Sequence, residues 1–122
     1  MDKELLQNTT LELRRGVIVL AVLNQLGEEQ YGYSLLKRLA DQGLELDQGT
    51  LYPLLRRLES QGLLESVWKL EESRPRRYYV ISAAGRELLP GLKEEWTKIV
   101  SMLEKMLATD KPKMKQKKEG KK

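Results

Sequence analysis

The chain has 122 residues, of which 40% are hydrophobic and 33% are charged, and this composition predicts one domain with a single packed core. It contains no cysteine and no histidine, so it lacks the best zinc ligands, the usual general base and any disulfide framework. No apolar run reaches the roughly 18 residues of a membrane span, and the first residues lack the order of a signal peptide, so we expect a cytoplasmic protein.

The first confident helix is predicted over residues 11–26, after a short or frayed helical arm at residues 1–10. From Val17 to Leu23 this helix is apolar on every side, so it must be covered all round. Two arrangements satisfy this requirement. Either a neighbouring protomer supplies part of the cover, or the helix is buried within one chain.

A turn at residues 27–30 leads into a second helix over residues 31–42, and Gly43 ends that helix because it can adopt positive φ. The third helix begins at a cap that is either Asp47 or Thr50. With Thr50 as the cap, Pro53 falls in the first turn and its missing N–H costs nothing. With Asp47 as the cap, one helical hydrogen bond is lost. The buried stripe of this helix consists of Leu51, Leu54, Leu55 and Leu58.

Two strands follow, over residues 63–68 and 77–82, and both are rich in β-branched or aromatic residues. The segment between them, KLEESRPR, predicts a loop of about eight residues, which is too long for a tight turn and is typical of a wing. A helix–turn–helix followed by a hairpin predicts a mainly α fold with a small β-hairpin, a winged helix-turn-helix over residues 1–82. The solvent-facing residues of the third helix and the hairpin could reach base edges and phosphates. These candidates are Gln48, Thr50, Tyr52, Arg56, Lys69, Arg74, Arg76 and Arg77.

The last helix, over residues 83–108, is expected to begin at Ser82 and to serve dimerisation. Its apolar residues are separated by 3, 4, 3, 4 and 3 positions, close to the period of about 3.5 residues of a coiled-coil seam. Pro90 predicts either a kink or two separate helices. The expected dimer interface consists of Leu89, Leu92, Trp96, Ile99, Leu103 and Met106.

The net charge of +4 is concentrated at the end of the chain. Residues 110–122 hold seven lysines against Asp110 and Glu119, a local charge of +5, so residues 1–109 carry −1 by subtraction. The segment 109–122 has little to bury and is expected to be disordered. It could be a solvated end, a non-specific DNA tether, or an interaction or degradation tail. DNA binding by the folded body must depend on where its charges lie.

Several motifs, in the same order along residues 11–106, closely resemble the PadR family of transcriptional regulators. They are Tyr31-Gly32-Tyr33, Gly49-Thr50-Leu51-Tyr52-Pro53, Arg56-Arg57-Leu58-Glu59 with Gly62-Leu63, Arg74-Pro75-Arg76-Arg77-Tyr78-Tyr79 and Ala84-Gly85-Arg86. The resemblance implies a dimeric winged-helix repressor with a short C-terminal helical arm. Tyr31 stands where the family often has histidine, and Ser73 where it usually has glycine. Tyr33, at the start of the second helix, joins the candidates for DNA backbone contact.

Trp96 has two interpretations. It could fill volume in the dimer interface, or, as the resemblance to multidrug-sensing members of the family implies, it could stack with its symmetry mate on a flat aromatic effector. We therefore predict a homodimeric repressor that binds an inverted-repeat operator in double-stranded DNA and is released by a small effector, which the second interpretation of Trp96 makes planar and aromatic. The alternative is a winged-helix adaptor that binds proteins instead of DNA. No nucleophile–base pair, phosphate-binding glycine loop or metal cluster is present in the sequence, so no enzymatic activity, metal or cofactor is expected.

Overall fold

The computed structural model describes residues 2–119, with side chains for residues 2–108. The chain divides into two compact units, and the boundary in the sequence falls between Leu89 and Pro90. Helix α1 spans Lys3–Gln25 and is capped by Asp2, whose carboxylate accepts hydrogen bonds from the N–H groups of Glu4 and Leu5. Residues 3–10 of the expected arm are thus the first part of one long helix, and residue 1 lies outside the described residues. No helix in the described part of the chain is long and apolar enough to cross a membrane.

Helices α2 (Gly32–Asp41) and α3 (Gln48–Ser60) complete the helix-turn-helix predicted from the sequence. The structure decides between the two proposed caps of α3, because the Asp47 carboxylate accepts from the Thr50 N–H at 2.8 Å. Pro53 consequently lies inside the helix, where it removes the hydrogen bond that would reach the Gly49 carbonyl. The connector between α2 and α3 starts at Gly43, whose φ of +102° confirms the predicted helix end.

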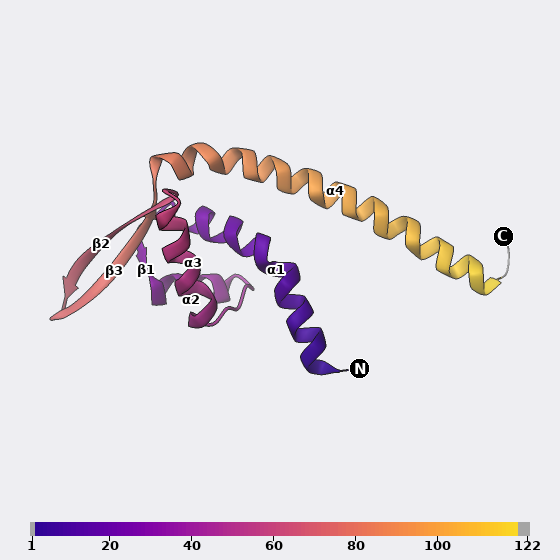
Figure 1. Cartoon of the computed structure of the whole chain (residues 1–122), viewed down its shortest axis with the longest axis horizontal. Coiled ribbons are helices and arrows are strands. Elements are labelled where there is room, and N and C mark those ends of the chain that lie inside the picture. Colours follow the sequence, from indigo (N-terminus) through magenta and orange to yellow (C-terminus); the bar gives the residue numbers. More distant parts are fainter. Residues whose placement is uncertain (1, 120–122) are drawn as a thin grey trace. The chain divides into compact units, whose positions relative to one another are not determined.

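A three-stranded antiparallel sheet combines one strand that precedes α2 with two strands that follow α3, in the order β1-β3-β2. Strands β2 (Leu64–Glu71) and β3 (Arg74–Ile81) form a ribbon that projects from α1, α2 and α3 (Figure 1). Strand β1 (Gln30–Tyr31) consists of the last residue of the expected turn and the first residue of the expected second helix, and it pairs with Tyr79 and Tyr78 of β3. The sheet therefore ties the wing to the start of α2.

The predicted loop of about eight residues is wrong, because Glu71 pairs with Arg74 and only two residues turn the chain. Glu72 and Ser73 have φ values of +50° and +67°, and positive φ at both positions is typical of a type I′ turn. Pro75 suits this register, since the pair next to the closing pair of such a hairpin exchanges no backbone hydrogen bond. The wing is a regular ribbon up to its tip.

The core of the first unit lies where α1, α2, α3 and the base of the hairpin meet. The predicted stripe of α3 is buried, as are Leu35 and Leu39 of α2. In α1, only one side of the apolar segment is fully buried, and Ile18, Val22 and Leu23 form that side. The Ile81 N–H donates to the Leu26 carbonyl at 2.8 Å and fastens the end of β3 to the end of α1.

Helix α4 spans Ala83–Glu119 and begins as predicted, because the Ser82 hydroxyl accepts from the Gly85 N–H at 3.0 Å. The same hydroxyl donates to the Gly62 carbonyl at 2.6 Å. The helix is one element through Pro90, so the alternative of two separate helices is not observed. The backbone also remains helical over 109–119, where no regular structure was expected, although this segment contains Pro112. Residues 120–122, the rest of the expected disordered tail, lie outside the described residues.

Candidate nucleic-acid interface

A groove of about 310 Å³ lies between the start of α2, the outer side of α3 and the hairpin. Its walls combine aromatic rings with guanidinium groups, which can stack on bases and bind phosphates. Most of these side chains come from segments that are far apart in the sequence and are joined by the β1–β3 pairing. The lining residues are Tyr31, Gly32, Tyr33, Tyr52, Arg56, Trp68, Arg76, Arg77 and Tyr79.

Tyr52 is positioned by close packing against the first residue of α2. A Cβ atom added to Gly32 would lie 2.7 Å from the Tyr52 ring, so only glycine allows this approach without displacing the ring. The glycine is therefore required by packing, and its φ lies outside the left-handed region. This contact fixes where the outer side of α3 presents Tyr52 to the groove.

Arg77 belongs to a hydrogen-bonded network that joins the hairpin to α3. Its guanidinium donates to Glu59 at 2.9 Å and to the Ser66 hydroxyl at 3.1 Å, and Ser66 donates to the other oxygen of Glu59 at 2.7 Å. The guanidinium also lies over the rings of Trp68 and Tyr79, at 5.8 and 5.5 Å from their centroids. Burial raises the pKa of Tyr79, and the Arg77 charge opposes this rise. Arg77 thus holds the base of the wing in place.

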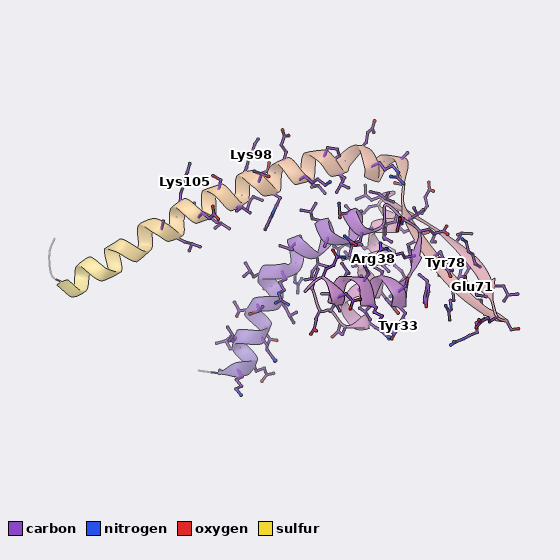
Figure 2. All side chains as sticks on the ribbon, turned by 180° about the vertical axis from the view of Figure 1, so that it is seen from behind. Tyr33, Arg38, Glu71, Tyr78, Lys98 and Lys105 are labelled. Carbon is purple, nitrogen blue, oxygen red and sulfur yellow. The ribbon has the colours of Figure 1, made fainter. Side chains whose placement is uncertain are left out.

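The opposite face of the hairpin carries a second cluster of charged and aromatic groups. Arg76 binds Glu71 at 3.4 Å and stacks over the Tyr31 ring at 4.4 Å. Tyr31 in turn meets Tyr78 edge to face, with ring centroids 5.5 Å apart. A hydrogen bond to Glu71 raises the pKa of Tyr78, while Arg76 lowers it. Figure 2 shows Glu71 and Tyr78 along the hairpin and Tyr33 on α2.

Lys69 also has an intramolecular partner. Its ammonium group binds the Glu29 carboxylate, in the segment just before β1, and lies 4.8 Å from the centroid of the Tyr78 ring. This ion pair is a contact between the wing and the turn that follows α1. Lys69 is therefore partly committed within the protein, although the sequence suggested a free cation for phosphate binding.

The structure brings five of the predicted site residues together in the groove, namely Tyr33, Tyr52, Arg56, Arg76 and Arg77. Arg74 lies beside them, in an adjoining hollow that it shares with Tyr33 and Arg76. Gln48 is the exposed first residue of α3 and does not line the groove. Thr50 lies on another side of the helix, in a hollow against α1 that it shares with Arg57.

Sequence reasoning missed the groove's Trp68 and the carboxylates that bind its arginines. Residues alternate between the two faces of a strand, so Trp68 shares a face with Arg77 and Tyr79 once the register of β2 and β3 is known. That register depends on the turn, which was not predicted from the sequence. Among the described residues, no group of three or more acidic side chains could hold a metal ion.

Comparisons with known proteins place these features in a family context. Residues 19–90, which include the whole groove, match the model of the Transcriptional regulator PadR-like family. The chain is 38% identical to Transcriptional regulator Rv3488 of Mycobacterium tuberculosis over 79 residues, or 64% of this chain and 74% of that protein. A PadR family transcriptional regulator from Eggerthella lenta is 45% identical, with a TM-score of 0.79 over 85% of this chain and 93% of its own. A PadR-like regulator from Bacillus cereus is 30% identical, with a TM-score of 0.69 over 79% and 96% of the two chains.

Proposed function

Because the chain belongs to the PadR-like family of transcriptional regulators, we propose that it is a homodimeric repressor that binds an inverted-repeat operator and leaves it when a small molecule binds. The chain is a DNA-binding regulator and not an enzyme. Repression, dimerisation and release by an effector are the further steps of the proposal.

The observation that carries the proposal is the groove between α2, α3 and the hairpin. An exposed helix can enter the major groove of DNA, and a neighbouring wing can contact the backbone beside it. Arg56 lines the groove from α3, and Arg74 lies beside it on the hairpin. Neither has an ion-pair partner among the side chains of residues 2–108. We assign Arg56 to base contact and Arg74 to phosphate contact.

The proposed roles of the other candidates follow from where each side chain lies. Gln48 and Tyr52 are proposed to approach base edges, and Tyr33 is proposed to contact the backbone from the start of α2. Thr50 is proposed to contribute less to DNA binding, because it lies in the hollow against α1. Arg76 and Lys69 each bind a carboxylate that a phosphate would have to compete with, and Arg77 is assigned to positioning.

Dimerisation is supported by apolar side chains that remain exposed on two helices. In α4, the side chains of Trp96, Leu103 and Met106 are exposed, and they belong to the seam of period about 3.5 residues. In α1, the N-terminal half also exposes large apolar side chains. These are Leu5, Leu6, Leu11 and Leu13. A second copy of the chain could cover both surfaces, and an inverted-repeat operator would match its two-fold symmetry.

The effector site is proposed at Trp96, whose side chain is 41% exposed. On a two-fold axis, the indole and its symmetry mate would offer two flat surfaces to a planar aromatic molecule. A ligand between them would change the separation of the two α3 helices, which must be about 34 Å apart to enter successive major grooves.

The proposal is tested by comparing Arg56→Ala with Arg57→Ala in binding to a duplex from the promoter of the chain's own gene. Both variants remove one positive charge from α3, but Arg56 lines the groove and Arg57 lies in the hollow against α1. Arg56→Ala should weaken binding about tenfold or more, whereas Arg57→Ala should have a much smaller effect. Equal losses, or a larger loss from Arg57→Ala, would contradict the assigned surface, and wild-type protein that binds no duplex would contradict the function.

A further inference from the structure

The basic residues of the hairpin differ in how they are paired within the protein. Lys69, Arg76 and Arg77 each bind a carboxylate, whereas Arg74 has no ion-pair partner among the described side chains. A phosphate that approaches one of the paired cations must compete with an acidic group already bound there. The affinity of the wing for DNA therefore depends on how readily each pair separates.

Of the two arginine pairs, Arg76–Glu71 is held by fewer hydrogen bonds than Arg77–Glu59. The Arg77 pair is reinforced by Ser66, and its two charged side chains are only 35% and 28% exposed. Arg76 and Glu71, by contrast, share a single contact of 3.4 Å, and although Arg76 is only 28% exposed, Glu71 is 45% exposed and can move into solvent. A phosphate offers a guanidinium charge-assisted hydrogen bonds at least as favourable as those of this exposed carboxylate.

The position of Arg76 does not depend on Glu71 alone. Its guanidinium lies 4.4 Å from the centroid of the Tyr31 ring, and Tyr31 is held by the β1–β3 pairing. Arg76 also lines both the groove and the hollow that contains Arg74. When Glu71 is removed, the guanidinium should stay stacked on Tyr31 and face the place where a phosphate would bind. The main effect of the Glu71 carboxylate is therefore to neutralise the charge of Arg76, because Tyr31 already orients the Arg76 side chain.

We propose that Glu71 is a specificity-determining residue that neutralises Arg76 in the free protein and is displaced by a DNA phosphate. This inference rests on the proposed function. Because a non-specific complex has few other contacts to offset this exchange, Glu71 lowers the affinity for arbitrary DNA. A duplex that also fits α3 provides those contacts and remains bound.

The test compares Glu71→Gln with Glu72→Gln, which removes the same charge from the neighbouring position at the tip. Glu72 makes no ion pair or hydrogen bond to a side chain among the described residues, so its variant measures the general effect of charge. Glu71→Gln should tighten binding to a random-sequence duplex about two- to fivefold more than Glu72→Gln, and should steepen the salt dependence. In an Arg76→Ala background, the extra gain from Glu71→Gln should vanish.

A second measurement follows the contact in the protein without DNA. The Glu71 hydrogen bond raises the pKa of Tyr78, so Glu71→Gln should lower this pKa toward 10.0, whereas Glu72→Gln should leave it in place. Phenolate absorbance, with Tyr78→Phe to identify the signal, reports this difference. Equal DNA binding by the two glutamine variants would overturn the proposed role of Glu71. So would a gain in DNA affinity from Glu71→Gln that persists in the Arg76→Ala background. Neither result would contradict the proposed function. Absence of DNA binding by every variant would overturn the proposed function as well.

Discussion

Separating Glu59 from Arg77 should reduce stability and DNA affinity together, because these residues join α3 to the hairpin. Three hydrogen bonds of 2.7–3.1 Å connect Glu59, Ser66 and Arg77 in a closed network. With the charged side chains 28% and 35% exposed, the pair lies between a surface ion pair and a buried one. We therefore expect a coupling energy of about 1–2 kcal/mol, above that of exposed pairs and below the cost of breaking a fully buried pair.

The coupling is measured by urea unfolding of the wild type, Glu59→Ala, Arg77→Ala and the double variant, all at one protein concentration. Glu12 and Arg15 provide the control pair, with a single 3.5 Å contact and side chains 71% and 76% exposed, so their coupling should stay below about 0.5 kcal/mol. A coupling at Glu59–Arg77 no larger than in the control would refute the reasoning.

DNA binding by Glu59→Ala separates positioning from simple electrostatics. Removal of a negative charge near the DNA surface should strengthen binding if Coulomb attraction alone decides. If Glu59 keeps the hairpin in place through Arg77, its removal should weaken binding to specific and random duplexes instead. Tighter binding by Glu59→Ala would show that the orientation of the wing does not depend on this network.

Two further predictions concern α4. Ile99→Asp combined with Leu103→Asp should convert a dimer into a monomer or an unfolded chain, and a double variant that sediments as the wild-type dimer would show that the seam is not the interface. In a Trp68→Phe background, which leaves Trp96 as the indole reporter, a planar aromatic effector should quench emission and weaken operator binding together. The coupling between the two ligands should be about 1–3 kcal/mol. Trp96→Ala should abolish the response and retain operator binding, whereas a response that survives this change would place the effector elsewhere.

The helices were predictable because their apolar residues follow the helical period and their ends carry recognisable residues. Leu51, Leu54, Leu55 and Leu58 form one buried stripe, and Gly43 and Gly62 have the positive φ values expected just after helices. The choice between Asp47 and Thr50 as the cap of α3 could not be made in this way. Pro53 favours an early position in a helix, but tertiary packing of the leucine stripe can outweigh one missing hydrogen bond.

The hairpin was harder to predict, because its turn contains none of the residues that normally mark a two-residue loop. Type I′ turns favour asparagine, aspartate or glycine at both central positions, whereas this chain has Glu72 and Ser73 there. Polar residues near the tip also hide the strand pattern, since a ribbon that projects into solvent has no buried face to impose alternation. Strand β1 is two residues long and is defined only by its pairing with β3.

The chemistry of the candidate site was predictable by residue type, but its internal pairing was not. Arginines in a wing can be recognised from sequence alone, whereas Glu59 is 18 residues from Arg77 and Glu29 is 40 residues from Lys69. These partners meet only because β3 lies between β1 and β2 and the ribbon passes beside α3. Assigning phosphate contacts to all the basic residues of the hairpin therefore overestimated how many of these residues lack an ion-pair partner within the protein.

This pairing bears on how a regulator with little net charge in residues 1–109 could still recognise DNA. Residues 1–109 carry a charge of −1, so long-range attraction by this part of the chain is weak and any binding must depend on local arrangement. In the proposed complex, Arg56 and Arg74 meet DNA without first losing a carboxylate, while Arg76 exchanges Glu71 for a phosphate. A duplex that contacts Arg56 and Arg74 but places its backbone away from Arg76 gains nothing from the exchange of Glu71 for a phosphate. Paired cations would then help to discriminate between sequences through the position of the backbone, even though Arg76 is not assigned a contact with a base.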